Sequence, residues 1–171
     1  MLDFVTVILA AGKGTRMKSS LPKVLHKAGG KAMLAHVLAA AKEAGAVRNI
    51  VVVGFGGETV EKALAGEADF VTQEEQLGTG HAVLQAEPLL HEEKGTVLVL
   101  CGDTPLLTGK LLKKLAKEHA AAGAKATVLT AVMPDATGYG RIIRAADGTV
   151  ERIVEHKDAT EEERNVREVN S

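Results

Sequence analysis

Three short, uninterrupted runs of apolar residues, each followed closely by glycine, constrain the fold of this chain most. They span Phe4 to Ala10, Asn49 to Val53 and Thr96 to Leu100, and glycines follow at positions 12, 54 and 102. Strands without alternation of apolar and polar residues are typical of parallel sheets that helices cover on both faces. The runs therefore predict buried strands that lead into glycine-containing loops.

The segments between these runs carry helical spacing. In Met33 to Ala44 the apolar residues recur at intervals of three and four, which predicts an amphipathic helix. The resulting β-α-β-α-β-α-β order predicts a three-layer α/β fold with a mainly parallel, Rossmann-like sheet. Further helices are expected over residues 58–65, 79–86 and 111–122 (the last with Leu111, Leu115 and Ala122 on one side), and further strands over 70–72 and 126–132.

The pattern changes after Pro134. Residues 141–144 and 149–154 flank Ala146-Asp147-Gly148, which predicts a β-hairpin inserted after about residue 134. A charged helix is expected over residues 158–165 and the start of a strand at 168–169.

Composition excludes several classes of protein. The 171 residues are 46% hydrophobic and 25% charged, which is ordinary for a globular domain, and the net charge of −1 argues against non-specific nucleic-acid binding. A single Cys cannot form an intrachain disulfide, and no apolar run approaches the roughly 20 residues that span a bilayer. The apolar start lacks a basic region before it, unlike a signal peptide. We therefore expect a cytoplasmic protein without nucleic-acid or membrane partners.

The glycine loop that follows the first strand carries the first chemical signal. The segment LAAGKGTRM (Leu9 to Met17) fits neither a Walker A loop nor a dinucleotide fingerprint, since Met17 stands where a small residue is needed. Three cations, Lys13, Arg16 and Lys23, surround the glycines, and backbone amides with such cations suit a polyphosphate. The alternative is a glycine turn with solvated basic residues.

Gly102-Asp103 directly follows a predicted buried strand. This position is the carboxyl edge of a sheet, where open α/β sheets bind ligands. One carboxylate there suits Mg²⁺, which also takes substrate phosphates and water. The alternative is that Asp103 only caps the turn into the next helix.

The loop from Gln73 to Gly80 contains a carboxamide and two glycines. A Gln side chain has both a donor and an acceptor, as reading a nucleobase edge requires. On chemistry alone, a polar loop leading into a helix capped by Thr79 is the favoured interpretation. The six His show no metal-ligand spacing, and Cys101 is interpreted as a small, buried apolar residue at a strand end.

Together, these segments resemble the sugar-phosphate nucleotidyltransferases. LAAGKGTRM is followed by LPKVLH at residues 21–26, and later come QEEQLGTGHA, CGDTPLL, GYGRI, IVEHKDAT and EVNS. This series is similar to the uridylyltransferase domain of the bifunctional bacterial N-acetylglucosamine-1-phosphate uridylyltransferase/glucosamine-1-phosphate acetyltransferases. The likeness runs in order along residues 1–171, which makes it far more specific than any single motif.

The resemblance implies a fold of the nucleotide-diphospho-sugar transferase type and a role for each matching residue. The uridine would lie against Leu9, Ala10, Ala11 and Gly12, and its uracil and ribose against Gln73, Gly78 and Thr79. The phosphates would contact Lys23, and the leaving pyrophosphate Arg16. Mg²⁺ would be bound by Asp103, with Cys101 and Gly102 beside it, although the family usually has Tyr in place of Cys101. The N-acetylglucosamine part would contact Gly140, Glu155 and Asn170.

The implied reaction joins UTP to N-acetylglucosamine 1-phosphate. A phosphate oxygen of the sugar attacks the α-phosphorus and pyrophosphate leaves in line, giving UDP-N-acetylglucosamine for peptidoglycan and lipopolysaccharide synthesis. Such chemistry relies on positioning and electrostatics, with Arg16, Lys23 and Asp103 as the catalytic residues. No nucleophilic side chain is needed.

The resemblance also implies that the chain is a fragment. In the family the domain continues for some tens of residues, and an Asn there is the second metal ligand. The acetyltransferase half, a left-handed β-helix that builds a homotrimer and binds acetyl-CoA, would also be absent. We therefore expect weak catalysis or none from these 171 residues.

Three other functions are alternatives to this reaction. One is nucleotidyl transfer to another sugar phosphate or to molybdopterin. A second is a non-catalytic module that binds a nucleotide sugar. A dinucleotide-dependent oxidoreductase is disfavoured, since the third small residue and an acidic residue about 20 positions later are both missing.

Overall fold

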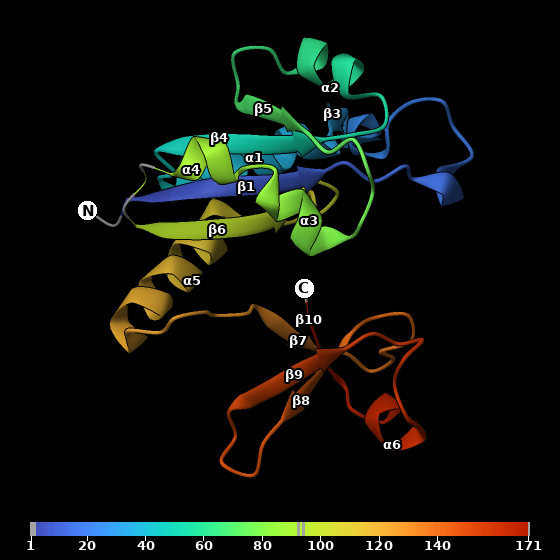
Figure 1. Ribbon diagram of the computed structural model, residues 1–171, viewed down its shortest axis with the longest axis vertical. Helices are drawn as coiled ribbons and strands as arrows, with labels where there is room; N and C mark the ends of the chain where they lie inside the picture. Colours follow the sequence, from blue (N-terminus) through green and yellow to red (C-terminus); the bar gives the residue numbers. More distant parts are fainter. Residues whose placement is uncertain (1–2, 92, 94, 171) are drawn as a thin grey trace. The chain divides into compact units, whose positions relative to one another are not determined.

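A parallel sheet forms the centre of the first of two compact units, Met1–Ala121 and Ala122–Ser171, in the computed structural model, which describes residues 3–91, 93 and 95–170. Its strands are β1 (Phe4–Ala10), β4 (Arg48–Val53), β5 (Asp69–Thr72) and β6 (Thr96–Cys101). They lie in the order β5-β4-β1-β6, and every neighbouring pair is parallel (Figure 1). The predicted α/β fold with a parallel sheet is confirmed.

Helices pack on both faces of this sheet. One face is covered by α1 (Met33–Ala44), α2 (Gly57–Ala63) and α5 (Gly109–Ala122), with Ile8, Leu34 and Val51 in the shared core. The other face is covered by α3 (Thr79–Leu84) and α4 (Glu87–Leu90), where Val7 and Ile50 meet Ala82. Because both faces are covered, the side chains of β1 and β4 are almost all buried, as their unbroken apolar sequences predict.

The edge strand β6 departs from that prediction. Its side chains alternate, with Leu98 and Leu100 in the core and Val97 and Val99 about 40% and 44% exposed. The short helices α3 and α4 pack on residues of β1 and β4, and β6 contributes nothing to that smaller core. The prediction of a strand buried on both faces is therefore wrong for β6.

Of the three residues predicted to share one side of the helix α5, Leu115 packs against the core, whereas Leu111 and Ala122 are exposed. The helix begins two residues earlier than expected, and it buries Leu112 and Ala116.

In the part of the chain that the structure describes, no helix is both long and apolar enough to cross a membrane.

Between β1 and α1 the chain forms small elements that the sequence did not predict. Two single-turn 3₁₀ helices, η1 (Thr15–Met17) and η2 (Lys23–Leu25), precede a hairpin of β2 (Lys27–Ala28) and β3 (Lys31–Ala32). Val24 and Leu25 of η2 are buried in the core, so this segment is tied to the sheet.

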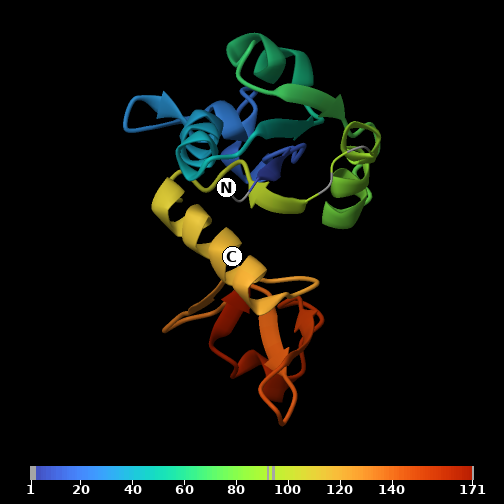
Figure 2. The same ribbon diagram turned by 90° about the vertical axis from the view of Figure 1, so that its left-hand side faces the viewer.

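The second unit contains a separate, antiparallel sheet. Its strands lie in the order β7-β10-β8-β9, with β7 at Thr130–Val132, β8 at Arg141–Arg144, β9 at Val150–Val154 and β10 at Glu168–Asn170. Figure 2 shows the β8–β9 hairpin and its turn in orange to red, which confirms the predicted hairpin. The strand predicted over residues 126–132 begins only at Thr130, and it pairs with β10 instead of extending the parallel sheet.

The helix α6 (Glu161–Arg164) is shorter than the predicted helix over residues 158–165. Its start is fixed by a capping box, in which the Thr160 hydroxyl accepts from the Glu163 amide and the Glu163 carboxylate accepts from the Thr160 amide. With Thr160 as its cap, the helix begins at residue 161 and not at the predicted residue 158.

An ion pair between β8 and β10 gives the second unit a predicted sensitivity to acid. Arg144 donates Nε and Nη2 to the two carboxylate oxygens of Glu168 at 2.8 and 2.6 Å, and this hydrogen bonding lowers the pKa of Glu168 to about 2. A lowered folded-state pKa stabilises the fold above the ordinary value of 4.5, and the contribution is lost as the pH falls toward 2. We expect Glu168→Gln to unfold with a shallower pH dependence between 4.5 and 2, measured by circular dichroism; an unchanged slope would contradict this.

Candidate functional site

The carboxyl ends of the four parallel strands define one edge of the first sheet, called here the carboxyl edge. Leu9 and Ala10 end β1 and are followed by Ala11 and Gly12, Gln73 follows β5, and Gly102 and Asp103 follow β6. Backbone bonds continue the pairing past the strand ends, from the Gly102 amide to the Leu9 carbonyl at 2.9 Å and from the Gln73 amide to the Val53 carbonyl at 2.7 Å. The structure thus brings together three loops that are far apart in the sequence.

Two glycines at this edge are required by the packing of the chain itself. A Cβ at Gly54 would lie 2.8 Å from the carbonyl oxygen of Ala11, so the loop after β4 rests directly on the loop after β1. A Cβ at Gly14 would lie 2.8 Å from the Cβ of Lys23, and Gly14 also has a positive φ of 59°. The backbone of the glycine loop is therefore held closely against Gly54 and Lys23.

Gly12 differs, since a Cβ there would meet no protein atom within 4 Å and its backbone does not adopt the left-handed conformation. Neither packing nor φ explains a glycine at this position. The space beside Gly12 is open at the end of β1, where a ligand could approach the backbone.

The cations of the glycine loop are placed in two different ways. Lys23 begins η2 and forms an ion pair with Asp103, 80 residues later in the chain, so both charged groups lie at the carboxyl edge. Lys13 and Arg16 are exposed and form no ion pair among the described residues. Two cations therefore stay available to an anion, and the third is held by a carboxylate.

The carboxylate of Asp103 fits the chemistry of a magnesium ligand. Its side chain is partly exposed and pairs with Lys23, rather than with a turn amide as a simple cap would. The described residues contain no cluster of three or more His, Cys, Asp or Glu side chains that could hold a metal by themselves. Mg²⁺, which usually binds one or two carboxylates with phosphates and water, fits this single carboxylate better than a metal that needs a full protein cage.

Cys101 ends β6 and is exposed, so the prediction of a buried strand-end cysteine is wrong. It belongs to the edge strand, whose alternate side chains are uncovered. Loss of solvent contact at the sulfur raises the pKa of the Cys101 thiol, and the negative charge of Asp103 raises it further by a smaller amount. The thiolate that nucleophilic catalysis would need is therefore disfavoured. The Cys101 carbonyl accepts the Thr104 hydroxyl at 2.6 Å, which fixes the turn after the strand.

Gln73 is the most buried polar side chain among the predicted nucleotide-binding residues, with 3% of its surface exposed. Its Nε2 lies 3.2 Å from the Gly78 carbonyl and 3.0 Å from Nδ1 of His81. Gly78, with a φ of 105°, is the N-cap of α3, and no side chain caps this helix. The predicted capping role of Thr79 is therefore wrong, because Thr79 is already the first helical residue.

In the second unit, the predicted sugar-binding residues share one edge of the antiparallel sheet. Gly140 precedes β8, Glu155 follows β9 and Asn170 ends β10, and the register pairs Arg141 with both Val154 and Val169. The Asn170 amide donates to the Gly140 carbonyl at 3.3 Å, and a Cβ at Gly140 would lie 2.6 Å from Asn170 Oδ1. Ser171, the last residue of the EVNS segment, lies outside the described residues.

Sequence reasoning missed two residues beside these sites. His81 contacts Gln73 from the first turn of α3, and a lone His in the sequence carries no spacing signal that would reveal it. Arg141 is 2% exposed and donates to the Tyr139 and Arg164 carbonyls, although arginines are almost always exposed unless paired. Only its position, directly after Gly140 in the GYGRI segment, hinted at a special environment.

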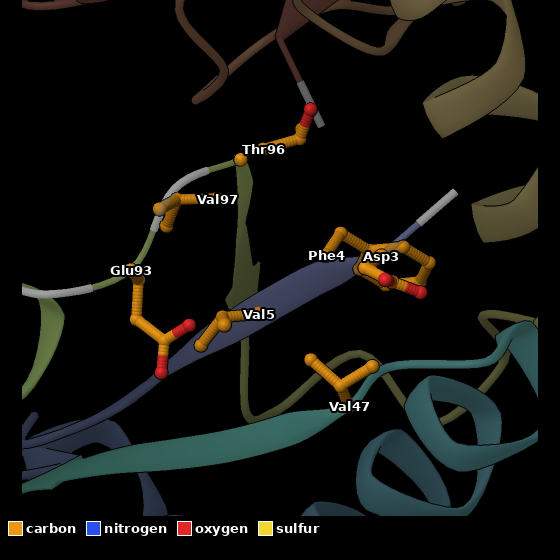
Figure 3. A pocket seen from close by; sticks show the side chains of 8 residues that line it. Asp3, Phe4, Val5, Val47, Glu93, Thr96 and Val97 are labelled. Carbon is orange, nitrogen blue, oxygen red and sulfur yellow. The ribbon is translucent and has the colours of Figure 1, made fainter. Parts of the chain in front are cut away.

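A small hollow lies at the opposite edge of the first sheet. Figure 3 shows Phe4, Val5, Thr96 and Val97 around it, at the amino ends of β1 and β6. Its volume of about 30 Å³ suits a water molecule and is far too small for a nucleotide. This hollow is therefore not a candidate for the functional site.

Comparison with known proteins identifies the family to which the chain belongs. Residues 6–163 match the model of the MobA-like NTP transferase domain. The chain belongs to this family. Its members are nucleotidyltransferases, so the chain is a nucleotidyltransferase by family.

Several bacterial relatives are more than half identical to this nucleotidyltransferase chain. The bifunctional protein GlmU of Exiguobacterium sibiricum is 55% identical over 170 residues, which are 99% of this chain and 38% of the relative. The bifunctional protein GlmU of Bacillus subtilis is 53% identical over 165 residues, which are 96% of this chain and 36% of the relative. The chain therefore spans well under half the length of these curated relatives.

Solved structures share the fold. A UDP-glucose pyrophosphorylase complexed with UDP-glucose has a TM-score of 0.76 at 20% identity, covering 99% of this chain and 74% of its own. A nucleotidyl transferase from Methanothermobacter has a TM-score of 0.58 at 25% identity, covering 67% of this chain and 56% of its own. The likeness to the pyrophosphorylase confirms the nucleotide-sugar transferase type of fold.

Proposed function

We propose that this chain is the uridylyltransferase part of an enzyme that makes UDP-N-acetylglucosamine from UTP and N-acetylglucosamine 1-phosphate, releasing pyrophosphate. The observation that carries the proposal is the placement of the Lys23–Asp103 ion pair and of Gln73 along one edge of the sheet, with Asp103 after β6 and Gln73 after β5. A phosphate-binding cation, a metal-binding carboxylate and a base-reading carboxamide are the groups that a nucleoside triphosphate needs. The identity to GlmU proteins of several bacteria supports the sugar and the base.

The nucleotide is bound by the loops of the carboxyl edge in this proposal. The uridine lies against Leu9, Ala10, Ala11 and Gly12, with Gln73, Gly78 and Thr79 at the uracil and ribose. Cys101 and Gly102 lie beside Asp103, the residue proposed to bind Mg²⁺. The open space beside Gly12 lets the backbone approach the nucleotide closely. Lys23, released from Asp103, contacts the phosphates, and the exposed Arg16 reaches the leaving pyrophosphate.

The chemical obstacle is the repulsion between two anionic reactants. Lys23 and Arg16 offset this repulsion and stabilise the charge that develops as pyrophosphate leaves. Mg²⁺ bound by Asp103 would supply further positive charge between the phosphates. The protein contributes position and electrostatics, and the raised pKa of the Cys101 thiol agrees with a mechanism that uses no thiolate nucleophile.

The N-acetylglucosamine part is assigned to Gly140, Glu155 and Asn170. The second sheet places these three residues at one edge, which supports their action as a group. Carboxylate and amide side chains are suitable partners for sugar hydroxyls and for an acetamido group. A cytoplasmic location, the absence of nucleic-acid and membrane partners and a homotrimeric parent protein remain parts of the same proposal.

Thermal unfolding with UTP, CTP, GTP and dTTP, each with Mg²⁺, tests the proposal. UTP is expected to raise the melting temperature most, and pyrophosphate release should require N-acetylglucosamine 1-phosphate. Stabilisation by GTP instead would contradict the assignment and favour another nucleotidyltransferase specificity. Binding of UDP-N-acetylglucosamine that needs no Mg²⁺, without any turnover, would favour a non-catalytic nucleotide-sugar-binding module.

A further inference from the structure

His81, at the start of α3, lies between two glutamine side chains. Its Nδ1 is 3.0 Å from Nε2 of Gln73, and its Nε2 is 3.2 Å from Nε2 of Gln85. A neutral imidazole carries one N–H and one acceptor nitrogen. His81 can therefore accept a hydrogen bond from only one of the two amide groups.

The backbone carbonyls beside each glutamine determine which of the two donates a hydrogen bond to His81. The NH₂ group of Gln73 also faces the Gly78 carbonyl at 3.2 Å, and that of Gln85 faces the His81 carbonyl at 3.1 Å. Turning the buried Gln73 would set its oxygen against the Gly78 carbonyl oxygen, and two acceptors that face each other at a buried side chain repel strongly. Gln85 is only half-buried, so its turned amide and the freed carbonyl can be solvated. Gln85 therefore turns its oxygen toward the Nε2–H of His81, and Nδ1 accepts from Gln73.

This arrangement leaves Gln73 with a single open group. Both hydrogens of its NH₂ are used, one by the Gly78 carbonyl and one by Nδ1 of His81. Among the described residues its Oε1 has no hydrogen-bond partner, and it is not one of the two buried side-chain atoms that lack one, which are His26 Nε2 and Arg141 Nε. The oxygen of Gln73 is therefore not completely enclosed by the described residues, and it can only accept.

We propose that His81 is a positioning residue that sets base specificity by holding Gln73 with only its oxygen presented to the nucleotide. A base with N–H at the contacted ring edge, such as uracil at N3, pairs with this oxygen. Cytosine presents an acceptor at the same ring position and is rejected, since two acceptors would face each other. This inference rests on the proposed binding of the base at Gln73, and His81 itself does not touch the base.

Variants at Gln85 test the inference without altering Gln73 or His81. Gln85→Glu can only accept from the imidazole, which fixes the proton on Nε2, so the ratio of the CTP to the UTP dissociation constant should stay at the wild-type value or rise. Gln85→Lys can only donate, which moves the proton to Nδ1 against Gln73, and this ratio should fall about tenfold. UTP and CTP carry the same charge, so the general electrostatic effect of each substitution cancels in the ratio, measured by isothermal titration calorimetry.

Substitutions at His81 test the same inference independently. Asn places an amide oxygen close to the position of Nδ1, so His81→Asn should keep the preference for UTP, whereas His81→Gln should lose it. If wild type prefers UTP but the ratio is the same in Gln85→Glu and Gln85→Lys, the inference is overturned and the proposed function stands. If wild type binds none of the nucleotides, the proposed function itself fails.

Discussion

Asp103→Asn is expected to change UTP binding in opposite directions with and without magnesium. In EDTA the variant should bind UTP severalfold more tightly, on the order of 1 kcal/mol, because a negative charge near the phosphates is removed and Lys23 is released from its ion pair. With Mg²⁺ present the variant should bind more weakly than wild type, since the carboxylate that would hold the metal is lost. Calorimetric titration with UTP in the two buffers measures both changes in affinity.

Lys23→Ala should instead weaken UTP binding in both buffers, by roughly 10- to 100-fold, because a charge-assisted contact to phosphate is lost. Lys27→Ala is the matched control, since Lys27 is exposed on the neighbouring hairpin and forms no ion pair among the described residues. It should bind UTP like wild type. Full magnesium-dependent tightening in Asp103→Asn, or weaker binding of that variant in EDTA, would contradict the account.

Gly54→Ala is expected to lower the stability of the fold, whereas Gly12→Ala is expected to lower the affinity for UTP without lowering stability. The new Cβ at residue 54 would lie 2.8 Å from the Ala11 carbonyl oxygen and 3.0 Å from the Ala11 Cβ, so the ends of β1 and β4 must move apart. Such overpacking should lower the free energy of unfolding by about 1–3 kcal/mol. Urea denaturation followed by circular dichroism measures the loss.

Gly12→Ala should keep the stability or raise it by about 0.4–1 kcal/mol, because the new methyl group meets no protein atom within 4 Å and the unfolded chain loses freedom. UTP affinity should nevertheless fall, since the methyl group occupies the space where the backbone approaches the nucleotide. An unchanged UTP affinity in a folded Gly12→Ala protein would show that the nucleotide does not approach this glycine.

The central sheet was largely predictable because its signals are local. The strand Phe4–Ala10 and the helix Met33–Ala44 have the predicted bounds, since each is an unbroken pattern that ends at glycine or at a helix stop. The two-residue strands β2 and β3 were missed because they are too short to show any periodicity. The exposed face of β6 was missed because burial depends on which helices cover an edge strand, and sequence alone does not supply that information.

The candidate site was predictable in its parts and not in its contacts. The sequence placed Asp103 and Gln73 after strands, and parallel pairing then brings them to one edge. The ion pair between Lys23 and Asp103 joins residues 80 positions apart, and the burial of Arg141 depends on the packing of a small antiparallel sheet. Both are tertiary effects. The contact between His81 and Gln73 is a third such effect, since it joins a loop residue to the first turn of α3.

The amide resonances of a ¹⁵N-labelled chain titrated with UTP and Mg²⁺ test the central claim most directly. We expect the largest shifts at the carboxyl edge, at Gly12, Gly78 and Gly102, three glycines that follow three different elements of the first unit. The amide resonances of residues around the small hollow at the opposite edge of this sheet, such as Val5 and Val97, should not shift. Shifts centred on that hollow, or none at saturating UTP, would contradict the claim that the carboxyl edge binds the nucleotide.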